Sequence, residues 1–355
     1  MSSIISSMRV RSLISLACAS LLFQGSLVAE DVYKFLNKIP IGGEGGWDIL
    51  TIDNTSRCLY LSHATKVVVV DLNKNAVLGA EITDTPGVHE FLPVHEFLRG
   101  FSSNGKESKA SVIDLNTLKT VSKLDTGEGP DAMVYEPLRG ELYIFNHKGN
   151  SATVIDVKTV SVVATIPLGG SPEFAAADGI AKHVYVNLED KNEVAVIDTM
   201  KHEVIARWPI APGDGPSGIA FDLGHHRLFA GCHNKLMAML DTETGKVITT
   251  VPIGAGVDGC AFDDNTQLAF ASCGDGTTTI AKEETPQKLT VVQTLKTERG
   301  ARTMALDPQT HRIYLPTAQF QPAPTPSPGM SPSRPAIVPN TLKLLVYGLA
   351  QAPKS

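Results

Sequence analysis

Carboxylate, imidazole and guanidinium side chains recur at turns along the chain, in a pattern that could form a polar binding site. Asp48, Asp131, Glu173 and Asp258 could bind a cation or an amine, and Arg302 could bind an anionic group. Histidines would make such binding pH-dependent near neutrality. The histidine candidates are His63, His89, His147 and His233. Only position singles these residues out, so the alternative is a solvated ring of hydrogen-bonded loops.

Common catalytic motifs are absent from the sequence. It contains no His-Glu-x-x-His, no Gly-x-Ser-x-Gly and no Cys-x-x-Cys motif, and these are typical of metalloproteases, hydrolases and zinc fingers. Three glycine-rich stretches imitate nucleotide-binding loops, at 127–132, 213–218 and 254–259. No helix pattern follows any of them to direct N–H groups at a pyrophosphate, so they are interpreted as turns between strands.

Four cysteines follow the N-terminal apolar segment: Cys58, Cys232, Cys260 and Cys273. The sequence places Cys260 and Cys273 diagonally on one face of two adjacent strands, where a disulfide is possible. Buried free thiols are the alternative, and exported proteins contain both forms. A soft-metal site that also uses Asp258 and His233 is a less favoured hypothesis, because no known ligand spacing supports it. No metal or cofactor is therefore predicted.

An internal repeat determines the elements that must position these side chains. An apolar residue followed by Asp recurs at Val70-Asp71, Ile113-Asp114, Ile155-Asp156, Ile197-Asp198 and Leu240-Asp241, with spacings of 43, 42, 42 and 43 residues. Each of these aspartates opens a polar turn, in which its carboxylate can accept backbone N–H groups. Repetition favours a structural role for them over a catalytic one.

Each repeat contains four short stretches rich in Val, Ile, Tyr and Thr between turn residues, and the clearest copy runs from 131 to 166. Such stretches are typical of strands, and four strands every 40 to 45 residues are typical of a propeller blade. The sequence therefore predicts an all-β fold, a seven-bladed β-propeller with four-stranded antiparallel blades, in one domain at 30–355. Two weaker copies complete the seven. At the position of the repeated Asp, which we call the anchor position, they have Ile280-Ala281 and Val346-Tyr347.

The last repeat lacks its outer strand, and the segment that follows the apolar N-terminus can supply it. Residues 32–42 end in Ile-Pro-Ile-Gly, much as 163–169 end in Ile-Pro-Leu-Gly. We therefore expect the N-terminal strand to complete the last blade and close the ring, which would remove an exposed strand edge. The proline-rich stretch at 321–340 interrupts that blade. It is interpreted as an insertion, either tolerated at the surface or used as a lid or partner-binding arm.

Two of the repeats carry a recognisable signature. Tyr185-Val186-Asn187 is followed by Val196-Ile197-Asp198-Thr199, and a second copy has Tyr143 to Asn146 followed by Val154 to Asp156. In these residues the chain resembles the YVTN-repeat family of bacterial seven-bladed β-propellers. The resemblance covers roughly residues 32–350 in repeat terms and implies an exported protein used as a binding scaffold.

The N-terminus and the charge balance restrict the compartment and the partners. Arg9 and Arg11 precede an apolar run, and Ala29 comes before an acidic start, which predicts a signal peptide at 1–29 and a periplasmic or secreted protein. No membrane span is expected after its cleavage. The whole chain has 31 Lys and Arg against 37 Asp and Glu, and it lacks a basic patch, so nucleic acid is not an expected partner.

The sequence thus favours a non-catalytic, monomeric scaffold that binds an unidentified protein or a small polar ligand through the loops on one face of the ring. In a propeller, the turns into the inner strand and between the second and third strands open on the same face. The alternative is a propeller enzyme, resembling a lactonase, hydrolase or quinoprotein, with a metal or cofactor at the channel mouth. One architecture supports many functions, so the fold does not decide between them.

Overall fold

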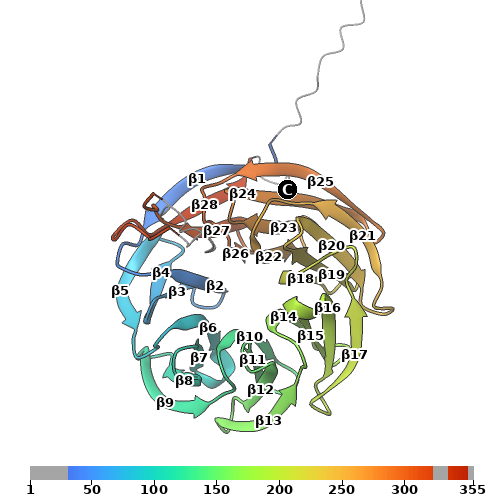
Figure 1. The fold of residues 1–355 in the computed structure, drawn as a ribbon. Coiled ribbons are helices and arrows are strands. Elements are labelled where there is room, and N and C mark those ends of the chain that lie inside the picture. The colour runs from blue at the N-terminus through green and yellow to red at the C-terminus, as the bar shows by residue number, and fades with distance from the viewer. Residues whose placement is uncertain (1–30, 323–334, 351–355) are drawn as a thin grey trace, which may run out of the picture. The chain divides into compact units, whose positions relative to one another are not determined.

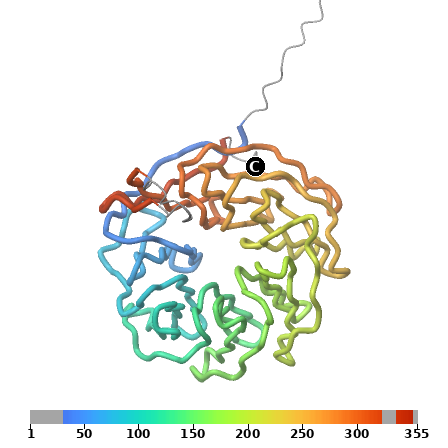
Figure 2. The backbone as a smooth tube through the Cα atoms, in the orientation of Figure 1, coloured from blue at the N-terminus to red at the C-terminus, as the bar shows by residue number. Residues whose placement is uncertain are grey.

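A computed structural model describes residues 31–322 and 335–350. From Val32 onward the chain belongs to one compact unit, in which seven four-stranded antiparallel sheets are arranged around a ring. Figure 1 shows one strand of every sheet near the ring axis and one at the rim. The backbone passes once around the ring, one blade at a time (Figure 2). The predicted seven-bladed β-propeller is confirmed.

The blades follow one another along the chain; the first six run from the inner to the outer strand, and the seventh takes its outer strand from the N-terminus. Their strands are β2 (Trp47–Asp53), β3 (Cys58–His63), β4 (Lys66–Asp71) and β5 (Ala76–Ile82); β6 (Val88–Val94), β7 (Arg99–Asn104), β8 (Lys109–Asp114) and β9 (Lys119–Asp125); β10 (Pro130–Glu136), β11 (Glu141–Asn146), β12 (Ser151–Asp156) and β13 (Ser161–Pro167); β14 (Pro172–Asp178), β15 (His183–Leu188), β16 (Glu193–Asp198) and β17 (Glu203–Pro209); β18 (Pro216–Asp222), β19 (Arg227–Cys232), β20 (Leu236–Asp241) and β21 (Val247–Pro252); β22 (Val257–Asp263), β23 (Leu268–Cys273), β24 (Thr277–Thr285) and β25 (Lys288–Lys296); and β26 (Ala305–Asp307), β27 (Arg312–Thr317), β28 (Lys343–Leu349) and β1 (Tyr33–Pro40). Short 3₁₀ turns occur at His95–Phe97 and Glu189–Lys191.

Burial explains the strand sequences. The second and third strands of each blade are largely buried on both faces, and most of them are apolar, whereas outer strands such as β9 and β13 are largely exposed. Apolar clusters join neighbouring blades around the ring, and one of them combines Tyr143 and Phe145 of β11 with Val184 and Val186 of β15. The hydrophobic core is therefore a series of interfaces between adjacent sheets.

The N-terminal strand closes the ring as predicted. β1 pairs antiparallel with β28, from Tyr33 opposite Leu349 to Pro40 opposite Lys343. The Tyr33 hydroxyl donates to the His311 carbonyl at 2.7 Å, and its ring packs edge-on against Phe270. The Gln293 side chain of β25 bonds both the N–H and the carbonyl of Tyr33. β1 therefore links the last blade to the sixth.

The repeated aspartates have the turn-forming role that the sequence predicted. Asp71 accepts the N–H groups of Asn73 and Lys74 at 2.9 and 3.0 Å, and Asp114, Asp156, Asp198 and Asp241 accept equivalent bonds. The anchor positions of the two weaker copies were wrong by one residue. Strand pairing puts Lys282 opposite Leu268, as Asp241 is opposite Arg227, so Lys282 and not Ala281 occupies the anchor position of the sixth blade. In the seventh blade Tyr347 pairs with Ile313, the second residue of β27, so Gly348 occupies the anchor position.

The proline-rich stretch lies between β27 and β28, and the structure describes only its ends. There Gln321 N–H donates to the Ala336 carbonyl and Val338 N–H to the Gln319 carbonyl, both at 2.8 Å. The predicted signal peptide at 1–29 lies outside the described residues. Within the described part of the chain, no helix is long and apolar enough to cross a membrane.

Candidate functional site at the channel mouth

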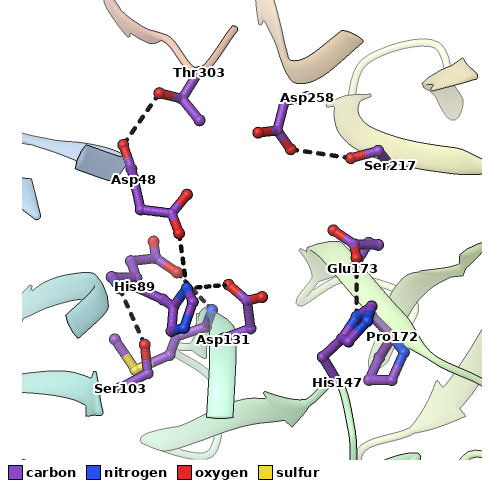
Figure 3. A network of polar contacts seen from close by, with 12 residues as sticks. Asp48, His89, Ser103, Asp131, His147, Pro172, Glu173, Ser217, Asp258 and Thr303 are labelled. Atoms are coloured by element: carbon purple, nitrogen blue, oxygen red, sulfur yellow. Dashed lines mark hydrogen bonds and ion pairs between the residues drawn. The ribbon is translucent and has the colours of Figure 1, made fainter. Parts of the chain in front are cut away.

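Seven side chains, one from each blade, surround the mouth of the central channel. Each stands five residues before the last residue of its inner strand, and all line one cavity: Asp48, His89, Asp131, Glu173, Ser217, Asp258 and Arg302. In six inner strands the pairing register shifts at this position, as in a β-bulge. A bulge redirects a side chain, and Figure 3 shows several of these side chains pointing into one central space.

His89 joins the first three blades at this mouth. Its Nδ1 lies 2.7 Å from Asp48 Oδ2 and 3.5 Å from Asp131 Oδ1. Burial by itself would lower the pKa of His89, but the bond to Asp48 and the charge of Asp131 together raise it to about 9. Burial raises the pKa of Asp131 to about 7, although the nearby His89 opposes this shift. The arrangement therefore contains one imidazole between two carboxyl groups.

A second imidazole lies on the next side of the cavity. His147 Nδ1 is 2.9 Å from Glu173 Oε1 and 3.2 Å from the Pro172 carbonyl. The bond to Glu173 raises the pKa of His147 to about 9, against the opposing effect of burial. Further along the wall, His233 Nδ1 lies 3.1 Å from Glu189 Oε1. Each imidazole thus has a carboxyl partner from a neighbouring blade.

Arg302 lies between two carboxylates. Its Nε donates to Asp258 Oδ2 at 2.5 Å, and its Nη2 lies 3.5 Å from Asp48 Oδ1. Burial raises the pKa of Asp258 to about 6 despite Arg302, and Ser217 donates a hydrogen bond to the same carboxyl group. The guanidinium charge is therefore compensated within the site. This arrangement gives no support to the expected role of Arg302 in binding an anionic group.

The cavity has a volume of about 440 Å³ and is open to solvent. Two groups of its side chains could hold a metal ion, Asp48 with His89 and Asp131, and His147 with Glu173 and Glu189, because the ligand atoms of each group lie within 4.8 Å of one another. Two carboxylates and one imidazole suit a divalent transition metal better than Ca²⁺, which prefers oxygen ligands.

His63 is not part of this site, contrary to the sequence-based prediction. It is the last residue of β3 and is 1% exposed, with Nδ1 2.9 Å from the Gly46 carbonyl. A Cβ on Gly43 would lie 2.6 Å from His63 Nε2, and Gly43 has φ +83°, so only glycine fits beside this ring. The last residue of each second strand is buried, and in the third, fourth and fifth blades the next residue lines the cavity.

Glu189 is the mouth residue that the sequence analysis missed. It follows the last residue of β15, as His147 follows β11 and His233 follows β19. These three positions are separated by 42 and 44 residues, so the repeat period contains the signal that would have identified Glu189. Asn187, two residues earlier in the same blade, is buried and donates its side-chain N–H groups to the Ser217 and Gly218 carbonyls.

The possible disulfide between Cys260 and Cys273 is not formed in the structure, where Cys58, Cys232, Cys260 and Cys273 are all free thiols. Cys260 pairs with Ala271 and Val257 with Cys273, so the two cysteines are diagonal on one face, as predicted. Diagonal neighbours have Cα atoms roughly 7–8 Å apart, which exceeds the usual disulfide span. No group of three metal-binding side chains among the described residues includes a cysteine.

Comparison with known proteins supports the fold. No family model matches the sequence, and no curated protein matches it. Among solved structures, a chain from the crystal structure of the mitotic checkpoint complex is similar with a TM-score of 0.68. The match covers 89% of this chain and 96% of that chain at 12% sequence identity. At this identity the likeness shows a common propeller architecture and nothing about the ligand.

Proposed function

We propose that the protein is an exported propeller that binds a small polar ligand with a cationic group at the channel mouth, without catalysis of its own. The observation that carries this proposal is the composition of the cavity wall. Five carboxyl groups, those of Asp48, Asp131, Glu173, Glu189 and Asp258, face one guanidinium and three imidazoles. Ligand sites typically combine a concave surface with a few convergent polar groups, and this mouth has both.

The charges at the mouth favour a cationic ligand over an anionic one. Arg302 and the three imidazoles each have a carboxyl partner within the site. Asp131 shares His89 with Asp48, so it belongs to a surplus of carboxyl groups over cations. An entering ammonium group would satisfy that surplus, whereas an entering carboxylate would have to displace an existing ion pair.

Export and family membership are further parts of the proposal. The charged and apolar N-terminal segment with Ala29 before an acidic start supports cleavage by a signal peptidase. The repeated Tyr-Val-Asn and Val-Ile-Asp motifs support the resemblance to the YVTN-repeat propellers. Both are consistent with a scaffold that functions in the periplasm or outside the cell, and the propeller fold is commonly used for such binding.

Calorimetric titration of the mature protein tests the ligand class. Putrescine is the cationic probe and succinate the anionic probe of similar size. We expect saturable binding of putrescine that weakens about tenfold or more in Asp131→Asn and in Glu173→Gln, since each variant removes one carboxylate from the wall. Asp125→Asn is the matched control, because its side chain is 88% exposed on an outer strand.

The proposal would be overturned by binding of succinate in preference to putrescine, or by putrescine binding that is equal in the wall variants and the control. Binding of neither probe, together with a protein captured at this face by crosslinkers placed on the mouth loops, would point to a macromolecular partner instead. Turnover of any bound ligand would contradict the non-catalytic part of the proposal.

A further inference from the structure

A second cluster of ionisable side chains lies between the fifth and sixth blades, at the end of the inner strands opposite the channel mouth. Asp222 ends β18, His225 lies in the turn that follows, and Glu283 belongs to β24 of the next blade. His225 Nδ1 is 2.7 Å from Asp222 Oδ2 and 3.2 Å from Glu283 Oε1. The three ligand atoms lie within 4.8 Å of one another.

Glu283 departs from the repeat at a position that is otherwise apolar or a threonine. In each of six blades the residue after the anchor position donates its N–H to the carbonyl of the residue before the second strand. The bond from Glu283 to Gln267, at 2.9 Å, is one of these. The equivalent residues in the other five blades are Leu72, Leu115, Val157, Thr199 and Thr242. The fold itself therefore does not require a carboxylate at this position.

The Glu283 carboxylate is buried without hydrogen bonds. The residue is 3% exposed, and neither of its carboxylate oxygens has a hydrogen-bond partner. The nearest guanidinium, that of Arg227, already binds Asp241 and the carbonyls of His226 and Pro286. Burying a carboxylate without hydrogen bonds costs several kcal/mol unless another group compensates it. His225 Nδ1 approaches it at 3.2 Å, outside hydrogen-bond geometry, and the other ionisable neighbour is the carboxyl group of Asp222.

The three candidate ligand atoms already lie in suitable positions, with His225 Nδ1 hydrogen-bonded to Asp222 Oδ2. Asp222 Oδ1 accepts the N–H groups of Gly224 and His225, which orients Oδ2 toward the cluster. Ligand atoms around a tetrahedral ion lie about 3.3 Å apart when each bond is about 2.0–2.1 Å, and the observed separations of 2.7 and 3.2 Å need little adjustment. The His225 side chain is 41% exposed, so an ion has access from solvent.

From these observations we infer that Asp222, His225 and Glu283 form a binding site for one divalent transition-metal ion, which bridges the fifth and sixth blades. Three protein ligands leave a fourth position for water. One imidazole with two carboxylates fits Zn²⁺, Mn²⁺ or Co²⁺ better than the hard cations. The site is separate from the channel mouth and does not depend on the function proposed there.

A proton shared by the two carboxyl groups is the rival account of this cluster. Burial and, after it, the charge of the nearby Asp222 raise the pKa of Glu283 to about 7. In that account the cluster binds no metal, and Glu283 is neutral near pH 6. The two accounts differ in a single measurable property, the binding of a metal by the folded protein.

Zinc titration of chelator-treated, folded mature protein distinguishes these accounts. The background is the mouth variant Asp131→Asn with Glu173→Gln, which removes one carboxylate from each candidate metal group at the mouth. We expect one equivalent of Zn²⁺ to bind, to raise the melting temperature, and to be replaceable by Co²⁺ with a visible absorption band. Glu283→Leu inserts the side chain found at the equivalent position of the first two blades, so it should fold. It should weaken Zn²⁺ binding more than about 100-fold.

His225→Ala is the second variant, and its exposed side chain makes misfolding improbable as a cause of lost binding. It should lose the Co²⁺ band as Glu283→Leu does. Absence of a one-equivalent site in the mouth variant overturns the proposal and favours the shared proton. Zn²⁺ binding that survives either Glu283→Leu or His225→Ala overturns the assignment of these ligands.

Discussion

At the scale of single residues, Glu90 shows how the mouth depends on a buried acid beneath it. Glu90 is 8% exposed on β6, and its carboxyl group accepts Met133 N–H at 2.5 Å and the Thr51 hydroxyl at 3.3 Å. These contacts connect the first three blades below His89. Burial raises the pKa of Glu90 to about 8; the two hydrogen bonds oppose this shift, and the charges of Asp131 and Asp48 add smaller contributions to it.

This raised pKa predicts how the stability should change with pH in Glu90→Gln. A carboxyl group whose pKa is higher in the folded than in the unfolded protein contributes stability below the unfolded pKa, and that contribution is lost as the pH rises through about 8. The glutamine imitates the protonated form and does not titrate. We therefore expect Glu90→Gln to resemble the parent near about pH 4, below the unfolded pKa, and to be about 1–3 kcal/mol more stable above pH 8.

Urea unfolding of both proteins at the two pH values measures this difference. All other titrating groups are common to the two proteins, so their effects largely cancel. A stability difference that stays constant between the two pH values would show that folding does not raise the pKa of Glu90.

The cysteines allow another prediction at this scale. Burial raises the pKa of Cys232 and Cys273 to about 12 and that of Cys260 above its usual range, so these thiols should react slowly. Cys58 and Cys260 are half-buried and Cys232 and Cys273 are buried, so the slow reaction expected of Cys260 rests on its raised pKa. With a thiol reagent under non-reducing conditions, we expect one rapid reaction in the folded mature protein and four thiols after unfolding. Only two thiols after unfolding would show that a disulfide forms in the exported protein.

At the scale of elements, the sequence predicted strands well and side-chain direction less well. The 42-residue period identified the residue five before the end of each inner strand, and those seven side chains do converge. The residues that reach the mouth from the ends of the second strands were predicted less well, because a shift of one residue turns a strand side chain to the opposite face. His63 was therefore assigned to the mouth and Glu189 was missed. Bulges at the inner strands are not visible in a hydrophobic pattern.

The closing strand gives the clearest prediction for an element. Tyr33 of β1 is fully buried among residues of the sixth and seventh blades. Tyr33→Ala should lower the free energy of unfolding by about 3–5 kcal/mol, as truncation of large buried aromatic residues does. Val121→Ala on the outer strand β9 is the control, because Val121 is 64% exposed, and it should change stability by less than about 0.5 kcal/mol.

Urea midpoints of the two variants provide the measurement. Deletion of residues 32–41 should have a larger effect, aggregation or loss of folding, since it exposes the edge of β28. If Tyr33→Ala unfolded at the same urea concentration as Val121→Ala, β1 would not be a stabilising closure.

At the scale of the whole molecule, seven similar blades carry different chemistry at equivalent positions. The repeat made the architecture predictable, because strand length, turn residues and the anchor Asp recur together. The pKa values of the side chains at the mouth could not be predicted from the repeat in the same way. The raised pKa values of His89, Asp131 and His147 depend on charges from several blades at once, and those depend on distances across the ring.

This summation across the ring predicts that a cationic ligand binds more tightly as the pH rises. Between about pH 5.5 and pH 8 an aliphatic diamine keeps both charges, since such groups titrate near about 10. Over the same range Asp258 and Asp131 lose protons, with pKa values of about 6 and about 7, so the mouth becomes more negative. Each additional charge is worth on the order of 1 kcal/mol, which predicts roughly tenfold tighter binding of putrescine at the higher pH.

Calorimetry at low ionic strength across this pH range tests the prediction, with Asp131→Asn as the comparison. The variant has lost the group with the pKa of about 7 and should show a smaller gain in affinity with pH. Added salt should weaken binding at the higher pH more than at the lower, because the attraction between exposed charges is screened. A putrescine affinity that is constant or falls as the pH rises would mean that the surplus of carboxyl groups at the mouth does not bind the cation.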